Sequence, residues 1–149
     1  MKHPENLFQE ESILINSNIN QVWEAITDWN IFKTCVPSLN GNLVYQGHPK
    51  SLDTIIHLYL TGKNSEFHMK VVGCEESEEK REYSLNYFAG KPQGPKQHLT
   101  FILFPIGEDR CLVNFRHDFK QWVSNKQISL IEKEKTSILM QLKNSFENK

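Results

Sequence analysis

The sequence has few of the residues that define disulfide-rich and zinc-binding proteins. Only three of its 149 residues are cysteines, namely Cys35, Cys74 and Cys111, and no two of them form a C-x-x-C pair. An odd number of widely spaced cysteines predicts neither a disulfide framework nor a structural zinc site. Reduced thiols are typical of cytoplasmic proteins, so we expect a cytoplasmic location.

Long apolar runs and an excess of one charge are also missing. No stretch approaches the ~20 apolar residues that a membrane-spanning helix needs, and the first residues lack the apolar core of a signal peptide. Lys and Arg total 17, Asp and Glu total 18, and the two signs are interleaved. Because nucleic-acid-binding proteins usually carry a basic excess or a basic face, we expect neither a nucleic-acid partner nor integral membrane association.

Motifs for metals, cofactors and nucleophilic catalysis are missing as well. None of the six histidines forms an H-x-H or H-x-x-x-H pair. The chain contains no P-loop, no G-x-G-x-x-G and no G-x-S-x-G. We therefore expect no metal and no cofactor.

What the chain does contain is enough apolar material for one folded domain. Its length suits a single domain, and 11% of its residues are aromatic, nine of them Phe. Residues 1–149 are therefore expected to form one domain, in which residues 1–9 are a flexible N-terminal arm.

The patterning predicts a strand, two short helices, six more strands and a long helix. A strand over 11–16 precedes helices over 19–27 and 29–35, and Asn18 with Gln21 is placed to cap the first helix in a capping-box manner. The other strands are expected at 42–47, 53–60, 66–75, 80–89, 98–105 and 110–119. Short turns join most of these strands, which favours antiparallel hairpins.

The last helix is expected over 125–147, where Ser124 and Gln127 form an S-x-x-Q capping box. Its apolar stripe comprises Ile128, Ile131, Ile138, Leu139, Leu142 and Phe146. One strongly curved antiparallel sheet could wrap around this helix and bury the stripe.

This order of elements resembles the START-like superfamily, also called SRPBCC. The segment that carries the resemblance is 13–39, with Val22-Trp23, Thr27-Asp28, the aromatic-rich Trp29 to Phe32 and then Pro37. The resemblance implies an α+β helix-grip fold, in which a curved seven-stranded antiparallel sheet wraps around a long C-terminal helix and two short helices follow strand 1. It also implies a cavity between sheet and helix that holds an apolar molecule such as a lipid or a polyketide.

Strand alternation indicates which side chains face that space. Those expected to line a ligand cavity are Ile56, Leu58, Phe67, Met69, Tyr83, Leu85, Tyr87, Phe101, Phe115, His117, Ile131, Lys135, Ile138 and Leu142. The same side chains could instead form an ordinary packed core.

Four of these residues are polar, and each allows two interpretations. Tyr83 and Tyr87 could donate to a ligand carbonyl or reach water. His117, the only candidate for catalysis, could be a general base or a hydrogen-bonded core residue. Lys135 lies near the centre of the helix's apolar stripe. Its ammonium is expected to extend past the helix edge, to meet a polar partner at the cavity mouth or to bind an anionic ligand group.

Three functions follow from these features. The leading hypothesis is the binding of a small hydrophobic ligand, such as a lipid or polyketide. The alternatives are an enzyme of polyketide cyclase or dehydratase type, in which His117 moves a proton, and a protein-interaction module with a filled core. The outer apolar residues Ile55, Tyr59 and Ile102 leave the oligomeric state open.

Overall fold

The computed structural model describes residues 8–62, 66–88, 97–119 and 124–147. Within them the strands form one antiparallel sheet in the order β1-β7-β6-β5-β4-β3-β2. The strands are β1 (Phe8–Ile15), β2 (Gly41–Gln46), β3 (Ile55–Leu60), β4 (Glu66–Glu76), β5 (Arg81–Phe88), β6 (Gln97–Ile106) and β7 (Arg110–Phe119). The helices are α1 (Ile19–Thr27), α2 (Trp29–Cys35) and α3 (Asn125–Glu147), with a 3-10 turn, η2, at Pro37–Leu39.

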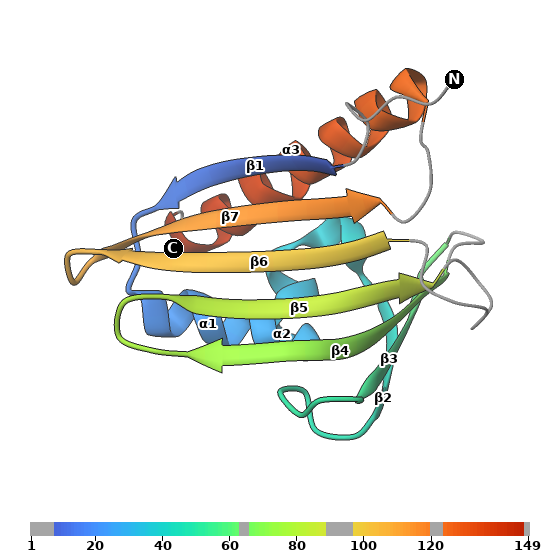
Figure 1. The fold of residues 1–149 in the computed structure, drawn as a ribbon, viewed down its shortest axis with the longest axis horizontal. Coiled ribbons are helices and arrows are strands. Elements are labelled where there is room, and N and C mark those ends of the chain that lie inside the picture. Colours follow the sequence, from blue (N-terminus) through green and yellow to red (C-terminus); the bar gives the residue numbers. More distant parts are fainter. Residues whose placement is uncertain (1–7, 63–65, 89–96, 120–123, 148–149) are drawn as a thin grey trace.

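All three helices lie on the same face of the sheet (Figure 1), which bends around them. A register shift between Val71 and Gly73 in the β4–β5 pair contributes to this bending, because an extra residue on one strand increases the local twist. The arrangement is the α+β helix-grip fold expected from the sequence, with a seven-stranded sheet, a long C-terminal helix and two short helices after β1. That prediction is confirmed.

Two strands begin more than one residue away from the predicted start. β1 starts at Phe8 rather than residue 11, because residues 8–11 pair with Asp118 to Phe115 of β7. The predicted arm over 1–9 thus overlaps two strand residues, and residues 1–7 lie outside the described ranges. β3 starts at Ile55 rather than residue 53, because Asp53 has a φ of 70°, which ends an extended strand.

The capping predictions are confirmed for α3 and only half confirmed for α1. The Ser124 N–H donates to Gln127 Oε1 (3.0 Å), and the Gln127 N–H donates to Ser124 Oγ (3.2 Å), which completes the capping box. Asn18 caps α1 by accepting from the Asn20 N–H (2.8 Å). Gln21 does not answer Asn18, because its Oε1 accepts from the Ser17 hydroxyl instead (3.0 Å).

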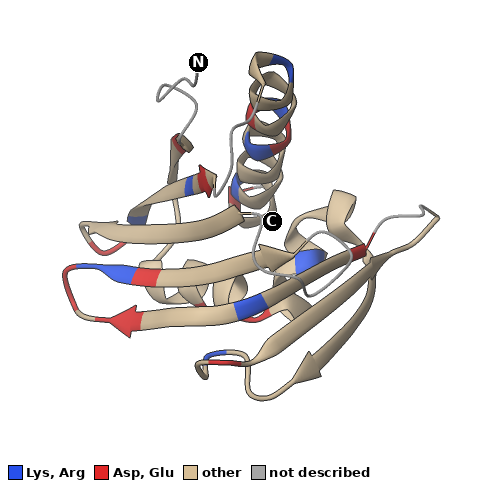
Figure 2. Cartoon of the chain, turned by 45° about the vertical axis from the view of Figure 1, so that its right-hand side comes forward, with Lys and Arg blue, Asp and Glu red and all other residues tan. Residues whose placement is uncertain are grey.

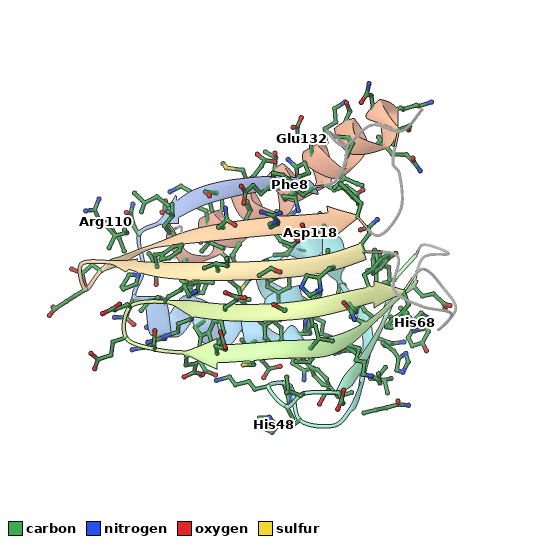
Figure 3. All side chains as sticks on the ribbon, viewed as in Figure 1. Phe8, His48, His68, Arg110, Asp118 and Glu132 are labelled. Atoms are coloured by element: carbon green, nitrogen blue, oxygen red, sulfur yellow. The ribbon has the colours of Figure 1, made fainter. Side chains whose placement is uncertain are left out.

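Helix α3 is buried mainly through its second half. Lys135, Leu139 and Leu142 are its buried residues. The first half extends past the end of β1 (Figure 1), and Glu132 lies on this part (Figure 3). Since 23 helical residues span about 35 Å, α3 is longer than the strand β1 that it crosses. The predicted burial of Ile128, Ile131 and Ile138 is therefore only partial, as all three are half-buried.

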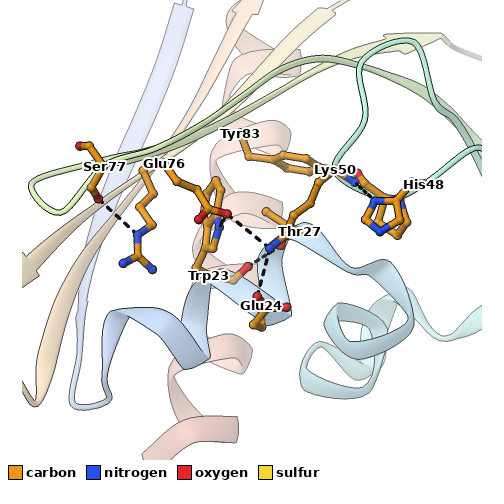
Figure 4. Close-up of polar contacts among 10 residues, drawn as sticks. Trp23, Glu24, Thr27, His48, Lys50, Glu76, Ser77 and Tyr83 are labelled. Carbon is orange, nitrogen blue, oxygen red and sulfur yellow. Dashed lines mark hydrogen bonds and ion pairs between the residues drawn. The ribbon is translucent and has the colours of Figure 1, made fainter.

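The connection between β2 and β3 is held against α1 and β4 by a polar cluster (Figure 4). Lys50 Nζ lies 3.0 Å from a Glu24 oxygen and 3.4 Å from a Glu76 oxygen. The Trp23 indole N–H donates to the same Glu76 side chain (2.6 Å). The Tyr83 hydroxyl donates to the Pro49 carbonyl (2.8 Å). These contacts close the space beneath β4 and β5 near α1.

Charge is not concentrated on any one element. Figure 2 shows acidic and basic residues following one another along α3 and occurring on both β4 and β5. Among the described residues, no helix is long and apolar enough to cross a membrane.

The unequal burial of α3 predicts unequal effects of truncating its leucines. Leu142 is fully buried, so Leu142→Ala should lower the free energy of unfolding by about 2–5 kcal/mol. Leu130 is 53% exposed in the projecting half, so Leu130→Ala should change it by less than about 0.5 kcal/mol. Urea unfolding of both variants measures these changes. Equal decreases in the free energy of unfolding would contradict the observed packing of the second half of α3 on the sheet.

Candidate functional site

A cavity of about 180 Å³ lies between the sheet, α2 and α3. Of the residues predicted to line a cavity, those that do so are Phe67, Met69, Tyr87, Phe101, Phe115, His117, Ile131, Lys135 and Ile138. They come from β4, β5, β6, β7 and α3, so strand alternation correctly identified side chains that meet in one place. Their role in binding a ligand remains a prediction.

Five other residues predicted for the cavity lie in the packed core instead. They are Ile56, Leu58, Tyr83, Leu85 and Leu142, each with none of its surface exposed. Tyr83 shows the reason, because its ring packs edge-on against Trp23 of α1 at 6.2 Å and its hydroxyl is bonded to Pro49. Helix α1 and the β2–β3 connection fill this end of the space, so the Tyr83 hydroxyl does not reach the cavity.

Sequence reasoning missed the part of the cavity wall that α2 supplies. The additional lining residues are Trp29, Phe32, Leu39, Gln97, Leu99 and Glu134. Trp29 and Phe32 are three residues apart and therefore share one face of α2. Leu99 shares the inner face of β6 with Phe101. The spacing could have identified both pairs, but it could not show that α2 lies over the same cavity as α3.

Aromatic rings form a continuous row along the cavity. The ring of Trp29 lies 4.9 Å from that of Phe32, which lies 5.9 Å from Phe101. Phe101 stacks on Phe115 at 4.1 Å, and Lys135 Nζ lies 3.7 Å above the Phe115 ring. The row thus connects an indole at one end with an amine at the other.

The amine end of this row is buried. Lys135 is 1% exposed, and its Nζ is hydrogen-bonded to His117 Nδ1. No carboxylate of the described residues forms an ion pair with this nitrogen. The prediction that the ammonium could extend into solvent is therefore wrong, and a polar partner takes the place of water.

Burial determines the protonation of both partners. Loss of hydration lowers the pKa of Lys135 to about 7, although Glu11 and Glu134 oppose the shift. Burial first, and then the charge of Lys135, lowers the pKa of His117 well below its ordinary range. The imidazole is therefore neutral at neutral pH, and its Nδ1 must accept whenever Lys135 is an ammonium, which has no lone pair. So low a pKa weakens His117 as a general base, which was one of its two expected roles. Its hydrogen bond to Lys135 fits the other expected role, that of a hydrogen-bonded core residue.

The indole end carries an unpaired donor. Trp29 is 5% exposed, and its Nε1 is buried without a hydrogen-bond partner among the described residues. Buried donors are nearly always paired, and leaving one unpaired costs about 1–3 kcal/mol. An acceptor atom on a molecule in the cavity would remove this cost.

Other polar groups add little to the site. Tyr87 is half-buried, and burial raises the pKa of its phenol, with a smaller contribution from Glu134. Among the described residues, no three His, Cys, Asp or Glu side chains gather where they could hold a metal ion. His57 and His68 contact each other across β3 and β4 (Nδ1–Nδ1 2.6 Å) but do not line the cavity.

No protein-family model and no curated protein matches this chain. Solved structures do resemble it. XoxI from Bacillus cereus superposes with a TM-score of 0.73 at 17% identity, covering 94% of this chain and 95% of that one. Norcoclaurine synthase from Thalictrum flavum, in complex with dopamine and hydroxybenzaldehyde, gives 0.65 at 12% identity, covering 99% and 91%. The Aha1 dimer from Colwellia psychrerythraea gives 0.71 at 14% identity, covering 95% and 96%.

These similarities cover nearly the whole chain and define its fold. The protein has the helix-grip fold, which is the fold implied by the resemblance of segment 13–39 to the START-like (SRPBCC) superfamily. The sequences of these structures are less than 20% identical to this chain, so a shared fold does not indicate a shared function. The function therefore has to be argued from the cavity itself.

The buried amine predicts how stability depends on pH. The unfolded chain binds the Lys135 proton up to pH near 10.5, whereas the folded chain releases it near 7. The unfolded state thus holds more protons between these values, and stability due to this group rises with pH across the window. Below about pH 7 the full cost of burying the ammonium remains.

Lys135→Met removes that cost, so it should stabilise the protein more at about pH 6 than at about pH 9, by on the order of 1–4 kcal/mol. Urea unfolding at the two pH values measures the difference. The matched control is Lys133→Met on the exposed face of α3, which should show no such difference. An identical effect of Lys135→Met at both pH values would contradict the assignment.

Proposed function

We propose that this protein binds a small, mainly apolar molecule in the cavity between the sheet, α2 and α3. The observation that carries the proposal is the combination of an apolar, aromatic-walled cavity with a buried donor, Trp29 Nε1, that has no hydrogen-bond partner in the described ranges. Ligand sites commonly have this composition, in which apolar walls provide affinity and a few polar groups fix orientation.

The cavity volume limits the size of the ligand. About 180 Å³ is close to the ~150 Å³ of an engineered apolar cavity that binds benzene, and is below the ~300–1,000 Å³ of typical pockets for drug-sized ligands. The volume favours one aromatic ring with short substituents over a long acyl chain or a polyketide of several rings. A planar ligand is also favoured, because a flat ring can stack against the aromatic rings of Phe101 and Phe115 in the cavity wall.

Polar groups at the two ends of the aromatic row would orient such a ligand. Trp29 offers an N–H to an acceptor at one end, and Lys135 lies at the other. A ligand oxygen is therefore expected at one end or both. A carboxylate would restore the charge of Lys135, as the sequence suggested, whereas a neutral oxygen would suit its uncharged amine. Norcoclaurine synthase, which shares the fold, has been solved with small aromatic molecules of this size class.

Enzymatic activity is the second candidate, and one observation favours it. Lys135 lies in the cavity with a pKa near 7, and perturbed groups in cavities are frequent in active sites. The interaction-module hypothesis gains less support, since it assumed a filled core. The cytoplasmic location expected from the unpaired thiols of Cys35, Cys74 and Cys111 remains part of this proposal.

Filling the cavity should abolish binding. Leu99 lines it and is 8% exposed, so Leu99→Trp places an indole in the proposed ligand volume. Benzyl alcohol, titrated by ligand-observed NMR, should bind the wild type and bind this variant at least about tenfold more weakly, a loss of about 1.4 kcal/mol.

Ile102→Trp is the matched control, because it adds the same bulk on the same strand but outside the cavity. It should leave affinity unchanged, and circular dichroism verifies that both variants fold. Equal affinity of all three proteins would place binding elsewhere. Failure of benzyl alcohol, toluene and benzoate to bind the wild type would overturn the proposal.

A further inference from the structure

The amine of Lys135 has surroundings unlike those of four other lysines in the described ranges. Its nitrogen faces the ring of Phe115 and the imidazole of His117, whereas Lys50, Lys70, Lys80 and Lys143 each pair with a carboxylate. A carboxylate favours the ammonium, but an aromatic wall and a neutral imidazole in a buried site do so much less. The surroundings of Lys135 thus favour an amine with a free lone pair.

An amine with a free lone pair is a nucleophile, and the ammonium is not. Lys135 also lines the cavity, so an atom of a bound molecule can reach its nitrogen. We propose that Lys135 forms a Schiff base with an aldehyde or ketone that is held in the cavity. The inference rests on the proposed binding function, and it narrows the ligand to small aromatic carbonyl compounds.

The reaction needs no other reactant. The Nζ lone pair attacks the carbonyl carbon, a C–N bond forms, and the C=O π electrons move to oxygen. A proton passes from nitrogen to that oxygen to give a carbinolamine. The nitrogen lone pair then forms the C=N bond as the C–O bond breaks, and the departing hydroxide takes the second N–H proton and becomes water, which leaves a neutral imine. One amine and one carbonyl thus become one imine and one water.

The walls around Lys135 suit this step. His117 Nδ1 is hydrogen-bonded to the amine, and the imidazole is itself held between Phe115 (5.5 Å) and Phe119 (6.0 Å). With the imidazole proton on Nε2, Nδ1 accepts from the amine and leaves the Nζ lone pair free. The ligand ring would lie along the row formed by Phe32, Phe101 and Phe115, which places its carbonyl near Nζ.

Charged groups on neighbouring elements act on the amine from further away. Glu11 of β1 and Glu134 of α3 both favour the ammonium, and Glu11 is engaged by the Thr136 hydroxyl (2.5 Å). His117 of β7 is neutral at neutral pH. Since burial outweighs the two carboxylates, the amine should react at neutral pH, where an exposed lysine with an ordinary pKa near 10.4 is almost fully protonated.

Reductive trapping tests the inference. The wild type is incubated with benzaldehyde and cyanoborohydride at about pH 7, and the benzylated lysines are found by intact mass measurement and peptide mapping. We expect labelling of Lys135 at least about tenfold faster than that of Lys126 or Lys133, which are exposed on the same helix. The rate at Lys135 should rise through about pH 7 and level off, whereas labelling of exposed lysines should keep rising to about pH 10.

Benzyl alcohol separates the two proposals, because it has the same ring but cannot form an imine. If it binds and slows the labelling of Lys135, both proposals are supported. If benzyl alcohol and benzaldehyde bind but Lys135 is labelled no faster than exposed lysines, the Schiff base is wrong and the binding function stands. If neither binds, the binding function fails.

Variants at Lys135 complete the test. Lys135→Arg and Lys135→Met should each lose the fast-labelled product while retaining the circular dichroism spectrum of the wild type. A fast product that persists in a folded variant would assign the reaction to another residue. Because the peptide map of the wild type identifies the modified lysine directly, the inference can be overturned even where neither variant folds.

Discussion

A buried amine that pairs with no carboxylate of the described residues is the constraint on which this candidate site depends. Helix α3 presents Lys135 at the position where its packing on the sheet would ordinarily require an apolar side chain. The neighbouring Leu139 and Leu142 are buried and fix the helix against the sheet. Exposing the amine to water would therefore require the helix to move away from the sheet. Its remaining stabilisation comes from the imidazole of His117 and the face of Phe115. An ammonium at this position loses its hydration, and this cost favours the uncharged amine at this end of the cavity.

The two ends of the space between sheet and helices are built differently. Near α1, the Lys50, Glu24 and Glu76 cluster and the Tyr83–Pro49 bond hold the β2–β3 connection in place, and side chains fill the interior. Near α2 and the middle of α3, none of the described segments plays that role, and a cavity remains. The packed end thus stabilises the fold, and the unfilled end provides the candidate site. Functional sites are commonly held in place by a rigid, well-packed scaffold of this kind.

The spacing of apolar residues predicted the architecture and much of the cavity wall. It could not predict which inward-facing side chains are packed in the core and which line the cavity. Leu85 and Tyr87 share an inner strand face, yet Leu85 is in the packed core and Tyr87 lines the cavity. Strand alternation gives the face on which a side chain lies but not what packs against it. The contribution of Trp29 was missed for the same reason, since the position of α2 depends on tertiary packing. Lys135 stood out in the sequence as a cation within an apolar stripe. Its partner could not be predicted, because a helix and a strand 18 residues apart meet only in the fold.

Lys135 should be an amine inside the cavity that is largely uncharged just above neutral pH. Carbon-13 NMR of the lysine ε-methylene groups follows each lysine separately through a pH titration, and Lys135→Arg assigns the signal. The account predicts one resonance with a midpoint near pH 7, the pKa to which burial lowers this group. A Lys135 resonance that titrates near the ordinary value of about 10.4 would contradict it.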